Sequence, residues 1–197
     1  MRLDGAAYAA LVADLDRACG DLDAAIERAP GAWDRARPGH WTFGGHADHV
    51  VRTMELFPPP FDTAAAALRA GTLAPPPARK ALERLFVAVV VRGGFMPRGG
   101  PAAPTTFPGD TPEPGDVRRR LRAAAAWWAA AGAGLDAATI DRLWILNPIM
   151  RASPRGARLG WHYTLPEAAR IQSVHVRHHL RQMRDLAAGK AATASRR

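Results

Sequence analysis

Apolar residues near the N-terminus recur every three or four positions, and this spacing constrains the fold more than any other feature of the chain. Residues three and four apart lie on the same face of an α-helix. The spacing therefore predicts an amphipathic helix over residues 3–28, ended by Pro30-Gly31, whose apolar face needs partner elements to cover it. The apolar face consists of Tyr8, Leu11, Leu15, Ala18, Leu22 and Ile26 (or Ala25).

Further helices are predicted between segments rich in proline and glycine. Thr42 is a suitable N-cap for a helix over residues 43–56, which the three prolines at 58–60 should end. The run 85–91 is rich in β-branched residues, which also suits a strand, but the helical residues before it favour a buried helix. Residues 93–115 are predicted as a surface loop that covers a site or contacts another subunit. The other predicted helices are 62–69, 78–92, 116–131, 137–146 and 166–188.

Composition indicates one all-α domain over residues 1–189, followed by a basic tail, residues 190–197, expected to be disordered. Apolar residues make up 48% of the chain, dominated by alanine, and aromatic residues only 7%, which favours helices over sheets. The sequence has no run of about 18 apolar residues, so no membrane span is predicted, and the N-terminus lacks the pattern of a secretory signal. Cys19 is the single cysteine, which excludes an internal disulfide. We expect it to be a small packed residue rather than a nucleophile. A cytoplasmic location is expected.

The charge balance alone does not indicate a nucleic-acid partner. Basic residues outnumber acidic ones by 27 to 18, a net charge of +9, and strongly basic chains often bind nucleic acid or anionic membranes. Here the arginines are spread over several predicted helices and loops, and no motif that reads bases is present. We therefore expect neither nucleic acid nor membrane as a partner.

Two histidine pairs on different predicted helices are the residues best suited to chemistry. His175 and His179 are four apart and share a helix face, as do His46 and His49, whose face also carries Thr53. Imidazole is a common ligand for zinc, nickel, copper and iron, and three protein ligands with an open position are typical of catalytic zinc sites. The alternative is that these histidines are surface residues or hydrogen-bonded core residues. His178 is predicted to turn toward an arginine-rich face, although a pair with His175 is geometrically possible.

The residues around the histidines resemble two motifs of a known family. Trp41 is followed by Thr42, with His49 eight residues after the tryptophan, which resembles the early motif of the DinB-like (YfiT-type) family. His175, His179 and Gln182 are similar to that family's late motif, two histidines four apart with a glutamine three residues further on. The order of the motifs and of the helices matches over most of the chain. Asn147 stands where one branch of the family has the histidine of a His-Pro pair.

This resemblance implies a four-helix bundle with extra short helices and long loops rich in proline and glycine. It implies that His49, His175 and His179 bind a divalent metal (zinc, nickel or iron), with His46 as a neighbour or spare ligand. Gln182 is expected to orient a ligand or water beside the metal, or else to fill a polar groove. Arginines 151, 155 and 158 are either solvated or available to hold an acidic substrate.

The implied activity is that of a metal-dependent enzyme acting on a small-molecule substrate. Members of the family include thiol-dependent transferases, so the resemblance implies either such a transferase, with a low-molecular-weight thiol as co-substrate, or a hydrolase. The family type also suits a homodimer. The alternative is a non-catalytic helical bundle, with a structural metal site or a role in protein interaction.

Overall fold

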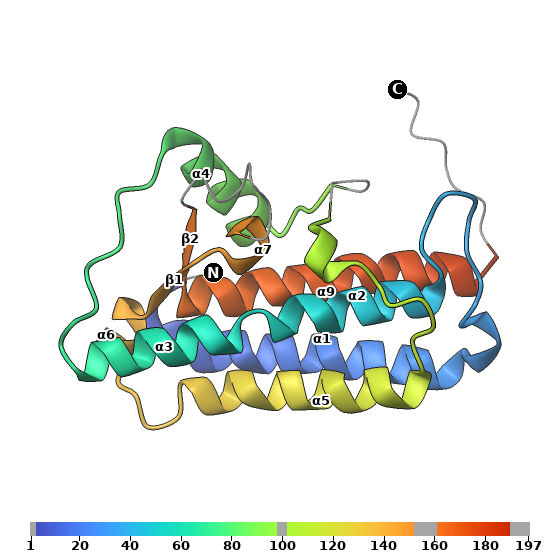
Figure 1. Cartoon of the computed structure of the whole chain (residues 1–197), viewed down its shortest axis with the longest axis horizontal. Coiled ribbons are helices and arrows are strands. Elements are labelled where there is room, and N and C mark those ends of the chain that lie inside the picture. The colour runs from blue at the N-terminus through green and yellow to red at the C-terminus, as the bar shows by residue number, and fades with distance from the viewer. Residues whose placement is uncertain (1–2, 98–101, 152–160, 190–197) are drawn as a thin grey trace.

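Four long helices lie side by side in the computed structural model, which describes residues 3–97, 102–151 and 161–189 (Figure 1). Helix α9 packs against both α1 and α2, and α5 packs against the same two helices on the other side. Apart from one short two-stranded sheet, the described elements are helical, as the composition predicts. The four helices are α1 (Tyr8–Arg28), α2 (Phe43–Glu55), α5 (Pro114–Ala131) and α9 (Leu165–Ala187).

The apolar stripe of the first helix is buried, as its spacing predicts. All six of its residues, and Ala25 as well, belong to the core, and a short turn, η1 (Gly5–Ala7), capped by Asp4 precedes the helix. Burial also raises the pKa of the Cys19 thiol to about 12, so this cysteine is a packed residue with no thiolate at neutral pH.

Prolines begin two of the predicted helices, which corrects two predicted boundaries. Helix α2 starts after Thr42, whose side chain accepts a hydrogen bond from the Gly45 N–H, as predicted. Helix α3 (Pro58–Arg69) starts at the first of the three prolines rather than at residue 62, and α5 starts at Pro114 rather than at residue 116. The first N–H groups of a helix have no intrahelical partner, so proline at the first positions sacrifices no hydrogen bond.

The β-branched run forms a helix, so the strand alternative is wrong. Helix α4 (Ala81–Phe86) continues into η3 (Val87–Arg92), a π-helical turn. Its burial is one-sided, because Val87, Val90 and Val91 are buried while Val89 is exposed. In the predicted loop 93–115, a short turn, η4 (Pro104–Thr106), places the Thr106 side chain in the interior, so this loop is not confined to the surface.

A small sheet replaces the end of the helix predicted over 137–146. Helix α6 (Ala137–Arg142) is followed by strand β1 (Trp144–Leu146), which pairs antiparallel with β2 (His162–Thr164). Strands this short carry no recognisable periodicity, and the partner strand lies beyond α7 (Pro148–Arg151). Thr164 then caps α9 in a reciprocal pair of hydrogen bonds with Glu167.

Some residues named in the sequence analysis are not among those that the structure describes. The tail 190–197, Arg155 and Arg158 lie outside the described residues. Within the described part of the chain, no helix is both long and apolar enough to cross a membrane.

The centre of the core is aromatic, and Trp128 of α5 occupies it. The Trp128 ring lies 5.7 Å from the Phe57 ring and 6.2 Å from the Phe61 ring, centroid to centroid. The Tyr8 hydroxyl donates a hydrogen bond of 2.7 Å to the Trp128 carbonyl, which joins α1 to α5.

Replacing this tryptophan should destabilise the protein strongly. We expect Trp128→Ala to lower the free energy of unfolding by about 3–5 kcal/mol, because it removes a large buried ring and leaves a cavity. Urea denaturation followed by circular dichroism measures this loss. The neighbouring Trp127 is only half-buried, so Trp127→Ala is the matched control and should cost clearly less. Equal losses in the two variants would contradict the placement of Trp128 at the centre of the core.

Candidate metal centre

Helices α2 and α9 bring their histidine faces together in antiparallel order. His46 Nδ1 lies 3.0 Å from His179 Nδ1, and His49 Nε2 lies 3.1 Å from His175 Nε2. Because the higher number on one helix pairs with the lower number on the other, the two helices run in opposite directions. The spacings of three residues on α2 and four on α9 each span about one turn, which keeps both pairs in register.

Three of these imidazoles are close enough to hold one metal ion. Ligand nitrogens of His49, His175 and His179 lie within 4.8 Å of one another, and all three side chains are buried. Two imidazole nitrogens bound to one ion at 2.0–2.1 Å are about 3.0–3.4 Å apart for ordinary coordination angles. The 3.1 Å separation of the His49 and His175 Nε2 atoms fits that range. These are the same three residues that the resemblance to the DinB-like family implies as ligands.

A backbone carbonyl sets the orientation of His49. Its Nδ1 lies 2.7 Å from the Thr106 carbonyl oxygen, and a carbonyl only accepts, so Nδ1 carries the hydrogen. The lone pair of the neutral ring is then on Nε2, which points at His175. A hydrogen bond of this kind on the second nitrogen is typical of metal-binding histidines. On His175, the buried Nδ1 has no hydrogen-bond partner in the described structure.

Burial keeps the histidines neutral, which is the form that binds metals. Desolvation, followed by the positive charge that His49 would carry, lowers the pKa of His46 to about 4. Desolvation also lowers the pKa of His49, and it lowers those of His175 and His179 well below the usual value. At neutral pH their lone pairs are therefore available without loss of a proton.

Several other side chains surround the three histidines. Trp41 packs against two of them, with its ring centroid 4.5 Å from that of His49 and 6.2 Å from that of His179. Gln182 is half-buried and lines the same cavity as the histidines. His178 also lines this cavity and is buried, so the prediction that it turns toward an arginine-rich face is wrong.

A cavity of about 500 Å³ adjoins the histidines. Exposed residues, Gly39, His40 and Pro97, belong to its lining, so the cavity reaches the surface. Its buried lining also contains Asn147, at the position of the family's His-Pro histidine, and three polar residues that the sequence did not single out as site residues: Thr53, Tyr163 and Gln172. Two of them carried a signal, because Thr53 is one turn after His49 and Gln172 is one turn before His175 on the same helix faces.

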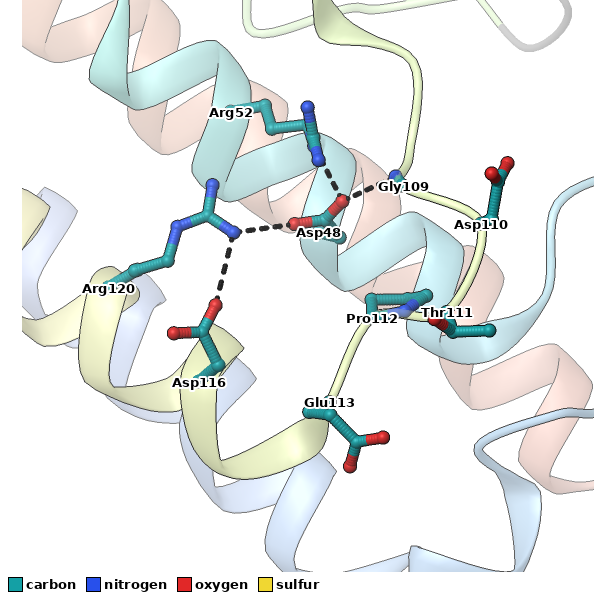
Figure 2. Close-up of a pocket in the computed structure, with 9 residues that line it drawn as sticks. All are labelled: Asp48, Arg52, Gly109, Asp110, Thr111, Pro112, Glu113, Asp116 and Arg120. Carbon is teal, nitrogen blue, oxygen red and sulfur yellow. Dashed lines mark hydrogen bonds and ion pairs between the residues drawn. The ribbon is translucent and has the colours of Figure 1, made fainter.

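On another side of α2, Asp48 ties the loop that carries Thr106 to the helices (Figure 2). This carboxylate accepts hydrogen bonds from the Gly109 N–H at 2.8 Å, from Arg52 at 2.7 Å and from Arg120 of α5 at 2.9 Å. Burial alone would raise the pKa of Asp48, but these donors lower it overall. The side chain therefore stays ionised and holds the loop in place.

This network borders a second hollow of about 400 Å³. Asp110, Glu113 and Asp116 also line it, and in Figure 2 the Asp110 and Glu113 carboxylates point away from Asp48. Asp116 shares Arg120 with Asp48. The paired charges around Asp48 have a structural role, which is to position the segment whose Thr106 carbonyl orients His49.

Loss of Asp48 should therefore weaken metal binding at a distance. We expect Asp48→Ala to lower zinc affinity about tenfold, because a loosened loop no longer holds the Thr106 carbonyl against His49. Competition with a chromophoric chelator measures the affinity. Asp116→Ala is the matched control, since Asp116 shares Arg120 but does not contact the loop backbone at Gly109. Unchanged affinity in Asp48→Ala, or the same loss in both variants, would contradict this role.

The neutral histidines should also make the metal-free protein sensitive to mild acid. Their pKa values are lower in the folded than in the unfolded state, so only the unfolded state binds protons as the pH falls below about 6.5. Stability is therefore full above that pH and decreases toward pH 4, by up to about 1.4 kcal/mol per pH unit for each such histidine. Urea unfolding at several pH values measures the slope.

The matched variant for this prediction replaces two of the buried imidazoles with neutral amides. His175→Gln/His179→Gln should show a shallower decrease in stability between pH 6.5 and 4 than the wild type, because two proton-binding groups are gone. Identical slopes in the two proteins would mean that these histidines are not held neutral by burial.

Comparisons with protein-family models, with curated proteins and with solved structures found no match to this chain. The resemblance to the DinB-like family therefore stays a prediction that depends on the motifs around Trp41, His49 and His175. What the chain does is inferred from the geometry of its histidines and its cavity.

Proposed function

We propose that this chain is a divalent-metal-dependent enzyme of the DinB-like type, acting on a small molecule as a thiol-dependent transferase or a hydrolase. The observation that carries the proposal is that His49, His175 and His179 cluster in the wall of a cavity that reaches the surface. Structural zinc sites are closed by four protein ligands, whereas catalytic sites keep a position open for substrate or water. The arrangement of α1, α2, α5 and α9 supports the proposed bundle type.

The donor set suits zinc, nickel or iron, and such an ion would supply a Lewis acid that polarises a bound electrophile. The protein's own residues would orient the metal-binding imidazoles and exclude water from them. The Thr106 carbonyl fixes the tautomer of His49, and Trp41 covers one side of the histidines. No aspartate, glutamate, lysine or arginine is among the described residues of the lining, so only imidazoles are available there to accept a proton.

Metal content is the first test of this proposal. Protein purified without a histidine tag should hold about one equivalent of zinc, nickel or iron, and His49→Ala/His175→Ala/His179→Ala should hold none while remaining folded by circular dichroism. Elemental analysis provides the measurement. A folded wild type that takes up no metal, even after reconstitution with each ion, would sink the three-histidine site.

Activity is the second test. The metal-loaded wild type should accelerate either the transfer of a low-molecular-weight thiol, such as cysteine or glutathione, to an aryl halide, or the hydrolysis of a nitrophenyl ester. The triple variant should lose at least 100-fold of that rate. A metal-loaded protein inactive in both reactions, or a triple variant as active as the wild type, would argue against catalysis at this site.

The second candidate is a non-catalytic protein that binds another protein, and an exposed apolar face favours it. Leu82, Leu85 and Val89 of α4 and η3 are 60%, 59% and 42% exposed, and exposed apolar groups of this size are typical of contact surfaces. A second copy of the chain is the simplest partner. Sedimentation equilibrium of the wild type and of Leu82→Lys/Leu85→Lys would separate a homodimer, disrupted in the variant, from a monomer.

A further inference from the structure

Two polar side chains lie one helical turn beyond the pair formed by His49 and His175. Thr53 follows His49 by four residues on α2, and Gln172 precedes His175 by three residues on α9. Because α2 and α9 are antiparallel, both residues lie on the same side of that histidine pair. Both line the cavity, and their exposed fractions are only 2% and 1%.

Neither side chain has its polar oxygen satisfied by the protein. The Thr53 Oγ1 and Gln172 Oε1 atoms are buried and have no hydrogen-bond partner in the described structure. Buried polar atoms are almost always hydrogen-bonded, and those left without a partner are strongly destabilising. Both residues line one cavity, so a rotation of either side chain would turn its oxygen toward a ligand that supplies the missing hydrogen bond.

Two other buried polar side chains of the lining, Asn147 and Tyr163, are hydrogen-bonded within the protein. The Asn147 amide nitrogen donates to the Tyr163 hydroxyl at 3.1 Å, and the Asn147 side-chain oxygen accepts from the Ile149 N–H at 3.0 Å. Asn147 and Tyr163 therefore line the cavity without needing a ligand to satisfy the atoms in these two hydrogen bonds. Apart from the candidate metal ligand His175, Thr53 and Gln172 are the described lining residues that carry a buried polar atom without a hydrogen-bond partner.

The described part of the lining offers no charged partner to a ligand. Its described residues include no aspartate, glutamate, lysine or arginine, and burying an ionised group without a partner is strongly unfavourable. A neutral molecule with an apolar body fits this surface better than a carboxylate or a phosphate. The apolar part of the lining includes Phe86, Val90, Met96, Ile149 and Ile171.

We propose that this cavity binds an uncharged, largely apolar small molecule whose hydroxyl or primary amide group hydrogen-bonds to Thr53 and Gln172. A ligand held there extends toward His49 and His175, one turn away. The role of this molecule as the substrate rests on the proposed function, but its binding to the cavity does not. Thr53 and Gln172 are thus residues that determine specificity, and the cavity volume of about 500 Å³ is within the range of small-molecule sites.

Matched probes with one carbon skeleton test the proposal on the metal-free full-length protein. 4-Phenylbutan-1-ol and 4-phenylbutanamide should bind the wild type, and 4-phenylbutanoate should bind at least tenfold more weakly, because its charge has no partner in the cavity. Butylbenzene, which lacks a polar group, should also bind more weakly than the alcohol. Isothermal titration calorimetry measures the four affinities.

Variants of the two polar residues complete the test. Thr53→Val and Gln172→Leu keep the size of each side chain and should weaken binding of the alcohol and the amide about tenfold, while butylbenzene binds as well as before or better. Thr63→Val, an exposed threonine on α3, is the matched control and should change nothing. Circular dichroism confirms that each variant is folded.

Three outcomes would overturn the proposal. These are no binding of any probe by the folded wild type, tighter binding of the carboxylate than of the alcohol, or unchanged selectivity in both variants. Because the protein is metal-free in this experiment, its result is separate from the metal analysis. A chain that binds the probes but no metal would keep this site and lose the proposed function. A chain that binds a metal but none of the probes would lose this site and keep the proposed function.

Discussion

The antiparallel contact between α2 and α9 is the feature on which the rest of the structure depends. It buries a polar seam, which we define as His46, His49 and Thr53 of α2 with Gln172, His175 and His179 of α9. Burying this many polar side chains between two helices is unfavourable unless they find partners. Two imidazole pairs, the Thr106 carbonyl and the Trp41 ring provide such contacts for the histidines. Thr53 and Gln172 have none within the described residues.

Ion pairs on the outer sides of the helices fix the rotation that turns the seam inward. Arg177 of α9 donates to Asp14 of α1 at 2.7 Å, and this contact lowers the pKa of Asp14 to about 2. Arg120 of α5 reaches Asp48 of α2 in the same manner. Each pair engages a helix on the side away from its histidines, so a rotation that exposed the seam would also break a partly buried ion pair. Much of the basic character of the chain is thus used within the fold, since these arginines have acidic partners.

The two proposals concern adjacent turns of this seam. The imidazoles form a set of neutral nitrogen donors suited to a divalent ion, and the next turn carries two oxygens without a hydrogen-bond partner in the described structure. A ligand bound to Thr53 and Gln172 would present its other end to the histidines, which is the arrangement that a metal-dependent enzyme requires. The same burial that lowers the pKa values of the histidines would also disfavour an ionised ligand group beside them. A single physical property, low polarity around a few placed polar groups, therefore accounts for both proposals.

The sequence by itself determined the helices and the composition of the histidine faces. Periodicity is a local property, so the stripe from Tyr8 to Ile26 and the pair of His175 and His179 could be recognised without any distant contact. Proline starts of helices were misjudged because proline is compatible with both ends of a helix. Only the tertiary structure decided which faces meet, because the contact of His49 with His175 spans 126 positions. The Thr106 group that orients His49 is a backbone carbonyl, which every residue type has, so no sequence pattern marks it. Burial of His178, pairing of β1 with β2 and the cavity beside Thr53 and Gln172 also depend on such distant packing, which no local pattern records.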